Sequence, residues 1–326
     1  MVRPALFSFA SAILAAASLS AEPPPGYVLA NGAVQIVGQA ELQGPIEALD
    51  RLYSNSHPAT RFAFAPSDDL AAIQSLTYGA SALAPVGAKF PSGAMGPYQI
   101  EVGEPFGIRI AHASVRPGAA ISPAAIIVHP GNPLAKLSAG QAARIFSPAG
   151  RQPALTHWGQ LGLAGSLQSE AIHPCGLPES DHYPSEDAAF SEHVYQEKFG
   201  PVPAFNYQRF ETYAEVIRQV AGDPDAIGVI PLSRVTPAVK VVAIAGDAWT
   251  EPSAGSAEDI VAGRYAYDRY LYIYARRKPH QPLDPLVRDY LRLVLSPEGQ
   301  QAVANATTGY LPLNSTEIGE ELARIR

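Results

Sequence analysis

Strand-like and helix-like segments alternate along this chain, and that order constrains its fold more than any other feature. Apolar strand-like runs lie at 33–38, 60–65 and 80–86, and helix-like stretches near 45–55 and 68–76 separate them. Chains with this order form α/β folds, in which helices flank a mostly parallel sheet. We therefore predict an α/β fold.

The alternation continues in the second half of the chain, where short polar signals mark the ends of helices. Ser138 is placed to cap a short helix. Thr212 and Glu215 have the spacing of a capping box, and Gly222 is placed to end the helix that they begin. The apolar run at 226–230 then predicts a buried strand, which completes a helix-to-strand unit.

The length of the chain predicts more than one hydrophobic core. The sequence has 326 residues, of which 47% are hydrophobic. Chains beyond roughly 250–300 residues usually divide into more than one core. Two lobes are therefore the expected organisation.

The first 21 residues have the features of a secretory signal peptide. Arg3 precedes an apolar run, and small residues follow it up to Ala21, after which we expect cleavage. No later stretch offers the ~20 consecutive apolar residues that a membrane-spanning helix requires. We therefore expect an exported, periplasmic protein that does not span the membrane.

The charge balance argues against nucleic acid as a partner. The formal net charge is −7, and loss of Arg3 with the signal peptide makes it −8. Phosphate backbones require a basic face, which this composition does not favour. Cys175 is the only cysteine, so an internal disulfide is excluded, and a buried free thiol is the simplest interpretation.

One polar stretch offers a possible metal site. The potential ligands between 173 and 193 are His173, Cys175, Glu179, Asp181, His182 and His193. Zinc and copper accept mixtures of this kind, although the spacing matches no fixed zinc motif. A solvated polar loop and a metal site formed by His173, Cys175, Asp181 and His182 both stay open.

Several longer segments resemble the phosphate-binding proteins of bacterial ABC transporters. The similarity is carried by "VHPGNPLAKLSAGQAARIFS" with "HWGQLG" after it, by "GDPDAIGVIPL", and by "AGRYAYDRYLYIYARR" followed by "DYLRLVLSPEGQQAVANATTGYLPLN". The order and spacing of these motifs match the family over most of 33–315.

The resemblance implies a type II periplasmic binding fold, in which two α/β lobes close over a small solute. Lobe 1 would comprise 27–127 and 236–326, and lobe 2 would comprise 128–235. Each lobe would hold a mostly parallel sheet flanked by helices. The expected partners are a solute, either an oxyanion or an organic molecule, and an ABC permease that recognises the closed form. A monomer without catalytic groups or cofactors is expected.

The resemblance also implies where the ligand would bind. The family holds its oxyanion with three loops, which correspond here to a cleft lined by 38–42, 66–69, 80–83 and 176–187. Helix N-termini and hydroxyl groups supply the donors in such loops. The residues at these positions are Gly38, Gln39, Ala40, Glu41, Ser67, Asp68, Ser81, Ala82 and Ser185.

These positions depart from the phosphate-binding pattern. Gln39, Ala40 and Glu41 replace hydroxyl residues, Ala82 stands where an Asp would accept the proton of hydrogen phosphate, and no Arg occurs from 152 to 208. A helix N-terminus favours an anion by about 0.3–1 kcal/mol. A carboxylate about 4 Å away opposes it by roughly 4 kcal/mol.

We therefore expect that the ligand is not free inorganic phosphate, or that phosphate binds only weakly. A larger organic or less charged solute would use Gln39, Ser67 and backbone N–H groups as donors, and acidic groups would meet a cationic portion or a metal. Whether Glu41 and Asp68 point into the cleft is open from sequence. A secreted phosphatase-like enzyme and a metal-binding or sensor paralogue are the alternatives, although no G-x-S-x-G, H-E-x-x-H or P-loop motif supports an enzyme.

Overall fold

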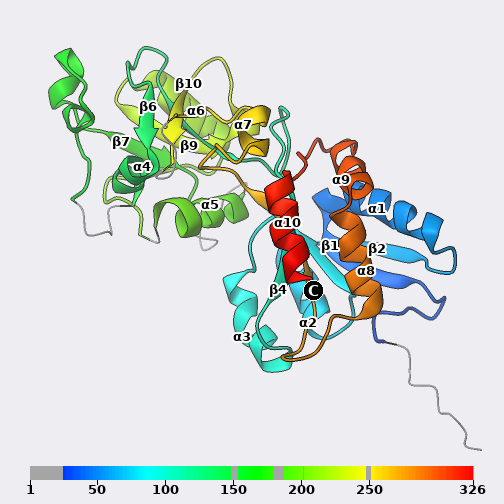
Figure 1. The fold of residues 1–326 in the computed structure, drawn as a ribbon. Helices are drawn as coiled ribbons and strands as arrows, with labels where there is room; N and C mark the ends of the chain where they lie inside the picture. Colours follow the sequence, from blue (N-terminus) through cyan, green and yellow to red (C-terminus); the bar gives the residue numbers. More distant parts are fainter. Residues whose placement is uncertain (1–24, 148–152, 179–186, 201, 247–250, 326) are drawn as a thin grey trace, which may run out of the picture.

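The protein forms two lobes, each with its own strands and hydrophobic packing (Figure 1). The computed structural model describes residues 25–147, 153–178, 187–200, 202–246 and 251–325. The predicted signal peptide lies outside these residues. The α/β fold in two lobes that the sequence predicted is confirmed, and the helices flank the sheets in both lobes.

Lobe 1 contains both ends of the described chain. Its strands are β1 (Val34–Gln39), β2 (Phe62–Ser67), β3 (Leu83–Val86), β4 (Phe106–His112) and β11 (Tyr270–Ala275). Its helices are α1 (Gln43–Ser56), α2 (Asp69–Thr77), α3 (Ser92–Glu101), α8 (Pro285–Val294), α9 (Pro297–Ala304) and α10 (Ser315–Arg324). A 3-10 turn, η1 (Ala40–Leu42), follows β1.

Lobe 2 is built around a six-stranded sheet of order β6-β10-β5-β9-β7-β8. The strands are β5 (Ala124–Val128), β6 (Lys136–Ser138), β7 (His173–Gly176), β8 (Gln208–Arg209), β9 (Ala226–Pro231) and β10 (Lys240–Ala245). The helices are α4 (Ala139–Phe146), α5 (Ala188–Val194), α6 (Tyr213–Gly222) and α7 (Ala257–Val261), and a π-helical turn, η4 (Tyr195–Phe199), follows α5.

Lobe 1 has a two-stranded parallel sheet, β1-β2, and a three-stranded antiparallel sheet, β3-β11-β4. The six-stranded sheet of lobe 2 is mixed, so the expectation of mostly parallel sheets is corrected. Strand β5 is antiparallel to both β9 and β10, and β11 is antiparallel to both β3 and β4. The pairs β1–β2, β6–β10, β7–β8 and β7–β9 are parallel. Strand β5 begins where the chain enters lobe 2, and strand β11 begins where the chain returns to lobe 1. They therefore run away from the junction, whereas their neighbours run toward it.

The core residues show where the chain passes between the lobes. It leaves the lobe 1 core after Ile121 and enters the lobe 2 core at Ala124, and it returns between Tyr267 and Leu271. The two crossing segments hydrogen-bond to each other, because Ala124 N donates to Tyr267 O at 3.1 Å. The lobe boundaries predicted at 127/128 and 235/236 stay predictions, and β10, which follows residue 235, pairs with β5 and β6.

The helix starts that the sequence indicated are confirmed. The hydroxyl of Ser138 accepts from Gln141 N at 3.0 Å at the start of α4. The hydroxyl of Thr212 accepts from Glu215 N at 3.3 Å, and the Glu215 side chain returns to Thr212 N. These signals succeed because a cap is a local interaction within one turn of the chain.

The C-terminal segment of 309–314 packs onto lobe 1. Tyr310 and Leu313 belong to its core, and Leu311 forms a β-bridge with His112 at the end of β4. Asn314 then caps α10 by accepting from Glu317 N at 3.0 Å. The segment thus connects the last helix to the strand that leads into the first crossing.

A buried charge network lies beside the crossings. His112 is fully buried, with Nδ1 at 2.6 Å from Asp268 Oδ2 and Nε2 at 3.1 Å from Glu317 Oε2. Burial by itself lowers the pKa of His112, but hydrogen bonds to the two carboxylates outweigh it and raise the pKa to about 9. The imidazolium therefore joins β4 to the second crossing segment and to α10.

We expect His112→Gln to destabilise the protein in a pH-dependent manner. The folded pKa of about 9 lies above the ordinary value near 6.5. The stabilisation by His112 is therefore complete below pH ~6.5 and is lost as the pH rises through about 9. Urea unfolding should show a difference between wild type and variant of about 3 kcal/mol at pH 6 that shrinks by pH 9.5. A difference that is constant over this range would contradict a charged His112.

Gly38 is expected to be required for the close approach of β1 to β3. A Cβ at Gly38 would lie 2.8 Å from two ring carbons of Pro85 and 3.0 Å from its carbonyl oxygen. Gly38→Ala should therefore lower the free energy of unfolding by about 1–3 kcal/mol. Gly44→Ala in α1 is the matched control, because nothing lies within 4 Å of the added atom. Gly44→Ala should raise the free energy of unfolding by up to ~1 kcal/mol. Equal urea midpoints for both variants would refute the steric argument.

Candidate functional site

A cavity of about 380 Å³ lies at the junction of the lobes. Gln39 and Glu41 reach it from lobe 1, at the end of β1 and in the turn that follows. The residues that line it are Gln39, Glu41, Ala120, Ile121, Asp187, Tyr213, Arg234 and Arg269. Ligands of α/β proteins bind beyond the carboxyl ends of strands and next to helix N-termini, and this cavity has both. It is therefore the candidate ligand site.

Arg269 forms the buried wall of this cavity. Arg269 is only 2% exposed, and its Nε donates to Gly87 O at 2.7 Å. Gln39 Oε1 accepts from Gly87 N at 2.7 Å, so two lining side chains hold the backbone N–H and C=O of the same residue. No hydrogen bond or ion pair joins the terminal nitrogen atoms of Arg269 to any residue that the structure describes. The guanidinium is thus fixed in position and has donors left for a ligand.

Carboxylates of the chain itself occupy two helix starts near the cavity. Asp187 Oδ1 accepts from Phe190 N at 3.0 Å at the start of α5, and its Oδ2 accepts from Tyr213 OH at 3.1 Å. Asp68 Oδ1 accepts from Ala71 N at 2.7 Å at the start of α2. A helix N-terminus that is capped by a carboxylate has less to offer an incoming anion.

Asp69 adds a further acidic group close to Arg269. Its Oδ1 is buried and has no hydrogen-bond partner among the described residues. Burial raises the pKa of Asp69 to about 6, Arg269 opposes that rise, and Glu41 and Asp187 add to it. Asp69 is therefore a third acid in the region of Arg269, in addition to Glu41 and Asp187 on the cavity lining.

The structure brings some of the predicted binding residues to the cavity and leaves others in the sheet. Gln39 and Glu41 line the cavity. Ser81 is buried, and its hydroxyl accepts from Val37 N at 2.8 Å and donates to Leu83 O at 2.6 Å. Ala82 next to it is buried as well. Ser81 and Ala82 are therefore surrounded by strand backbone rather than by the cavity.

The remaining predicted residues have local contacts. Gly38 packs against Pro85, and Ala40 is exposed in the turn after β1. The Ser67 hydroxyl donates to Asp68 O at 2.9 Å. Ser185 and most of 176–187 lie outside the described residues. The role of all these residues in ligand binding stays a prediction.

Among the lining residues that sequence reasoning missed, Arg234 and Arg269 are the charged ones. The family resemblance pointed to an arginine within 152–208, whereas these two follow β9 and precede β11. One signal was present in the sequence. Asp268 and Arg269 stand together at the start of an otherwise aromatic and apolar strand, and charges in such a place need a partner or a function.

The metal alternative finds little support in the described residues. His173 Nδ1 lies 2.8 Å from Asp223 Oδ2. Cys175 is fully buried in β7, and burial raises the pKa of its thiol to about 12. Asp181 and His182 lie outside the described residues. Within the part of the chain that the structure describes, no three His, Cys, Asp or Glu residues are grouped to hold a metal ion.

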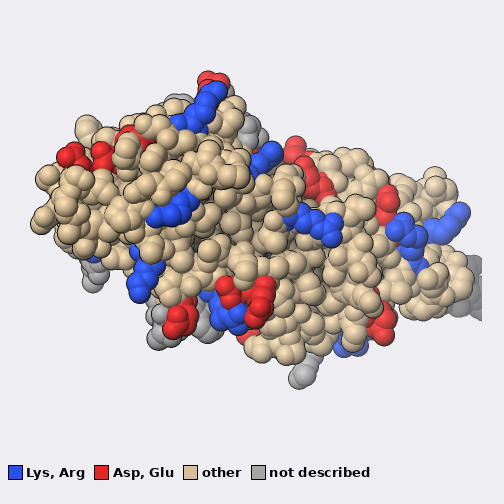
Figure 2. Space-filling model, turned by 90° about the horizontal axis from the view of Figure 1, so that it is seen from above, with Lys and Arg blue, Asp and Glu red and all other residues tan. Residues whose placement is uncertain are grey.

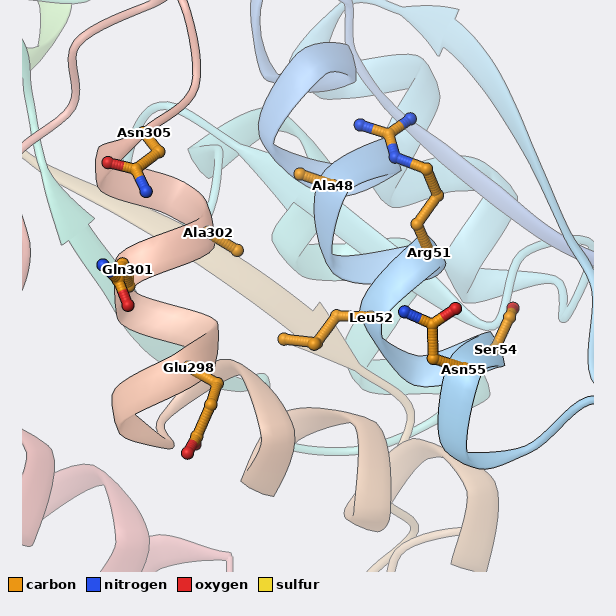
Figure 3. Close-up of a pocket in the computed structure, with 9 residues that line it drawn as sticks. All are labelled: Ala48, Arg51, Leu52, Ser54, Asn55, Glu298, Gln301, Ala302 and Asn305. Atoms are coloured by element: carbon orange, nitrogen blue, oxygen red, sulfur yellow. The ribbon is translucent and has the colours of Figure 1, made fainter.

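A larger hollow of about 640 Å³ is a groove on the surface of lobe 1 (Figure 3). Its walls are α1 and α9, and none of the predicted binding residues reaches it. Arg51 in this groove lies 4.0 Å from Glu47 one turn earlier in the same helix. We consider the cavity at the lobe junction the better site, because residues from both lobes and a buried charge converge there.

The face of the molecule in Figure 2 shows basic and acidic residues scattered among uncharged ones. It has no continuous basic surface of the kind that binds a phosphate backbone. Among the described residues, none of the helices has the length and apolar character needed to cross a bilayer.

An ion pair joins the two lobes directly. Lys89, in the loop after β3, lies 2.7 Å from Glu197 Oε2 in η4. His193 Nδ1 lies 2.9 Å from the other carboxylate oxygen of Glu197. Burial raises the pKa of Glu197, but the contacts with His193 and Lys89 outweigh it and lower the pKa to about 2. The pair bridges lobe 1 and lobe 2.

Comparison with known proteins agrees with this architecture. The Phosphate-binding protein PstS of Pseudomonas aeruginosa is 28% identical over 324 residues, which cover 95% of this chain and 93% of the relative. The PstS structure from Borrelia burgdorferi has a TM-score of 0.58 at 15% identity and covers 87% of this chain and 99% of its own. The ABC-type phosphate transport receptor from Vibrio cholerae has a TM-score of 0.54 at 16% identity, with 86% and 99% covered.

The two structures support the type II periplasmic binding fold, and the relative supports the resemblance that the sequence motifs indicated. A family model described as a PBP superfamily domain matches residues 117–298, which is more than half of the 326-residue chain. This chain therefore belongs to the PBP superfamily.

Proposed function

We propose that this protein is an exported receptor that binds a small organic solute between its lobes and presents it to an ABC permease. The observation that carries the proposal is the cavity at the junction, which residues of both lobes and the buried Arg269 line. The relative from Pseudomonas aeruginosa is named as a phosphate-binding protein, which supports a receptor role. A periplasmic location follows from that role and from the predicted signal peptide.

We infer that the ligand is not free inorganic phosphate, or that phosphate binds only weakly. Arg234 and Arg269 favour an anion, but Glu41 and Asp187 line the same cavity. Asp187 also caps α5 in the place where an anion would gain from the helix dipole. Two charges about 4 Å apart interact by roughly 4 kcal/mol at an effective dielectric of 20, so each carboxylate can cancel what an arginine contributes.

A receptor without catalytic activity fits the cavity better than a phosphatase-like enzyme. Tyr213 carries the only hydroxyl among the described lining residues, and it donates to Asp187. Activation of a nucleophile requires a base that takes its proton during the reaction, and Asp187 is already committed to the helix start. The structural relatives are described as receptors and binding proteins.

We expect calorimetric titration of ligand-free protein with phosphate to give a dissociation constant weaker than about 1 µM. The double variant Glu41→Gln with Asp187→Asn should bind phosphate at least ~10-fold more tightly, because it removes two negative charges from the cavity. Asn at position 187 still caps α5, so the helix start is preserved.

Glu47→Gln is the matched control, since Glu47 lies on α1 and pairs with Arg51 outside the cavity. Its affinity for phosphate should equal that of the wild type. Micromolar or tighter binding by the wild type would overturn the inference about phosphate. An unchanged affinity of the double variant would show that Glu41 and Asp187 do not face the bound anion.

The ion pair between Lys89 and Glu197 should favour the closed arrangement of the lobes. Lys89 is largely exposed, so the pair contributes about 0.2–1 kcal/mol. Lys89→Met should therefore reduce the ratio of closed to open molecules by up to ~5-fold. Single-molecule energy transfer between dyes on the two lobes measures this ratio directly. Lys278→Met on the surface of lobe 1 serves as the control, and a shift of equal size in both variants would argue against the pair.

A further inference from the structure

The cavity at the lobe junction holds opposite charges that do not neutralise each other. Its lining includes two arginines, Arg234 and Arg269, and two carboxylates, Glu41 and Asp187. Within the described part of the chain, neither arginine lies within 4.0 Å of either carboxylate as an ion pair. Elsewhere arginines do pair closely, as Arg264 does with Asp259 at 2.6 Å. The cavity thus keeps its positive and negative groups apart.

The positive side of the cavity is built to hold an anionic group. Arg269 is almost completely buried and anchored through Nε to Gly87 O, and no described residue pairs with its terminal nitrogen atoms. A preorganised guanidinium binds carboxylate or phosphonate oxygens with two parallel hydrogen bonds. Arg234 lines the cavity from lobe 2, has no partner among the described residues, and can approach the same group.

The negative side of the cavity is divided between the lobes. Glu41 lies in the turn after β1 in lobe 1, and Asp187 lies at the start of α5 in lobe 2. Asp187 is held by Phe190 N and Tyr213 OH, which fixes its orientation. The Glu41 side chain is exposed and makes no hydrogen bond to another described residue. A cationic group between Glu41 and Asp187 would therefore gain contacts from both lobes.

We propose that the ligand is a small zwitterion, with an oxyanion group on Arg269 and Arg234 and a protonated amine between Glu41 and Asp187. This rests on the proposed receptor function and names the class of solute for the same cavity. The charges of the described lining residues sum to zero, which matches a zwitterion and does not match a divalent anion. The cavity of about 380 Å³ lies near the lower end of the usual range for ligand pockets, so the ligand is small.

Calorimetry with matched probes tests the proposal. One set comprises 2-aminoethanesulfonate, ethanesulfonate and ethylamine, and the second comprises γ-aminobutyrate, butyrate and butylamine. Glucose represents a neutral polyol. We expect at least one of the two zwitterions to bind about tenfold or more tightly than both of its single-charge analogues, because a hydrogen-bonded charge is then gained at each end.

Variants assign each end of the zwitterion to its side of the cavity. Glu41→Gln should lower the affinity for the zwitterion about tenfold. The affinity for its anionic analogue should stay the same or rise. Arg234→Gln should lower the affinity for both the zwitterion and its anionic analogue. Arg234 is exposed, so this variant tests the anionic end even where Arg269→Gln fails to fold. Glu298→Gln, on the surface groove between α1 and α9, should change neither affinity.

The contrary outcomes separate this proposal from the receptor function. Equal affinity for a zwitterion and its anionic analogue, with loss of both in Arg234→Gln, would overturn the zwitterion and keep the receptor. Tighter binding of glucose than of either zwitterion would overturn the zwitterion proposal in favour of a neutral solute. Failure of all seven probes to bind overturns the zwitterion proposal. If a small-molecule library also produced no ligand whose binding depends on Arg234, the receptor function would fail as well.

Discussion

The buried guanidinium of Arg269 sets the electrostatics of the region between the lobes. A charge that leaves water must be compensated by hydrogen bonds and opposite charges, or the folded state loses several kcal/mol. The carbonyl of Gly87 supplies one hydrogen bond, and the nearby Asp69 supplies an opposite charge. Because Arg269 belongs to the second crossing segment, the charge of the cavity and the connection between the lobes depend on one stretch of chain.

Two carboxylates change what the scaffold can bind. Asp68 and Asp187 each accept a backbone N–H at a helix start, where a phosphate-binding site would keep such donors free. These caps stabilise their helices by about 1 kcal/mol each and at the same time place negative charge near the cavity. Fold and ligand preference can therefore diverge, since a cap that serves the helix removes a donor from the site.

Much of the fold could be predicted from the sequence, and less of the site. Strands such as β1 and β9 follow from apolar runs, and the starts of α4 and α6 follow from Ser138 and Thr212, because these signals act over a few residues. The antiparallel direction of β5 and β11 depends on how the chain crosses between lobes. The meeting of Gln39 with Arg269 joins residues far apart in sequence, and no local pattern specifies it.

The placement of charges across the junction links ligand chemistry to closure. Glu41 approaches the cavity from lobe 1 and Asp187 from lobe 2, so their mutual repulsion opposes approach of the lobes while the cavity lacks a cation. A positively charged group between them turns that repulsion into two attractions, which exist together only when the lobes are close. The Lys89–Glu197 pair between the lobes also favours their approach. A ligand can shift the equilibrium only by its difference in affinity for the two states, and a cation shared by both lobes supplies that difference.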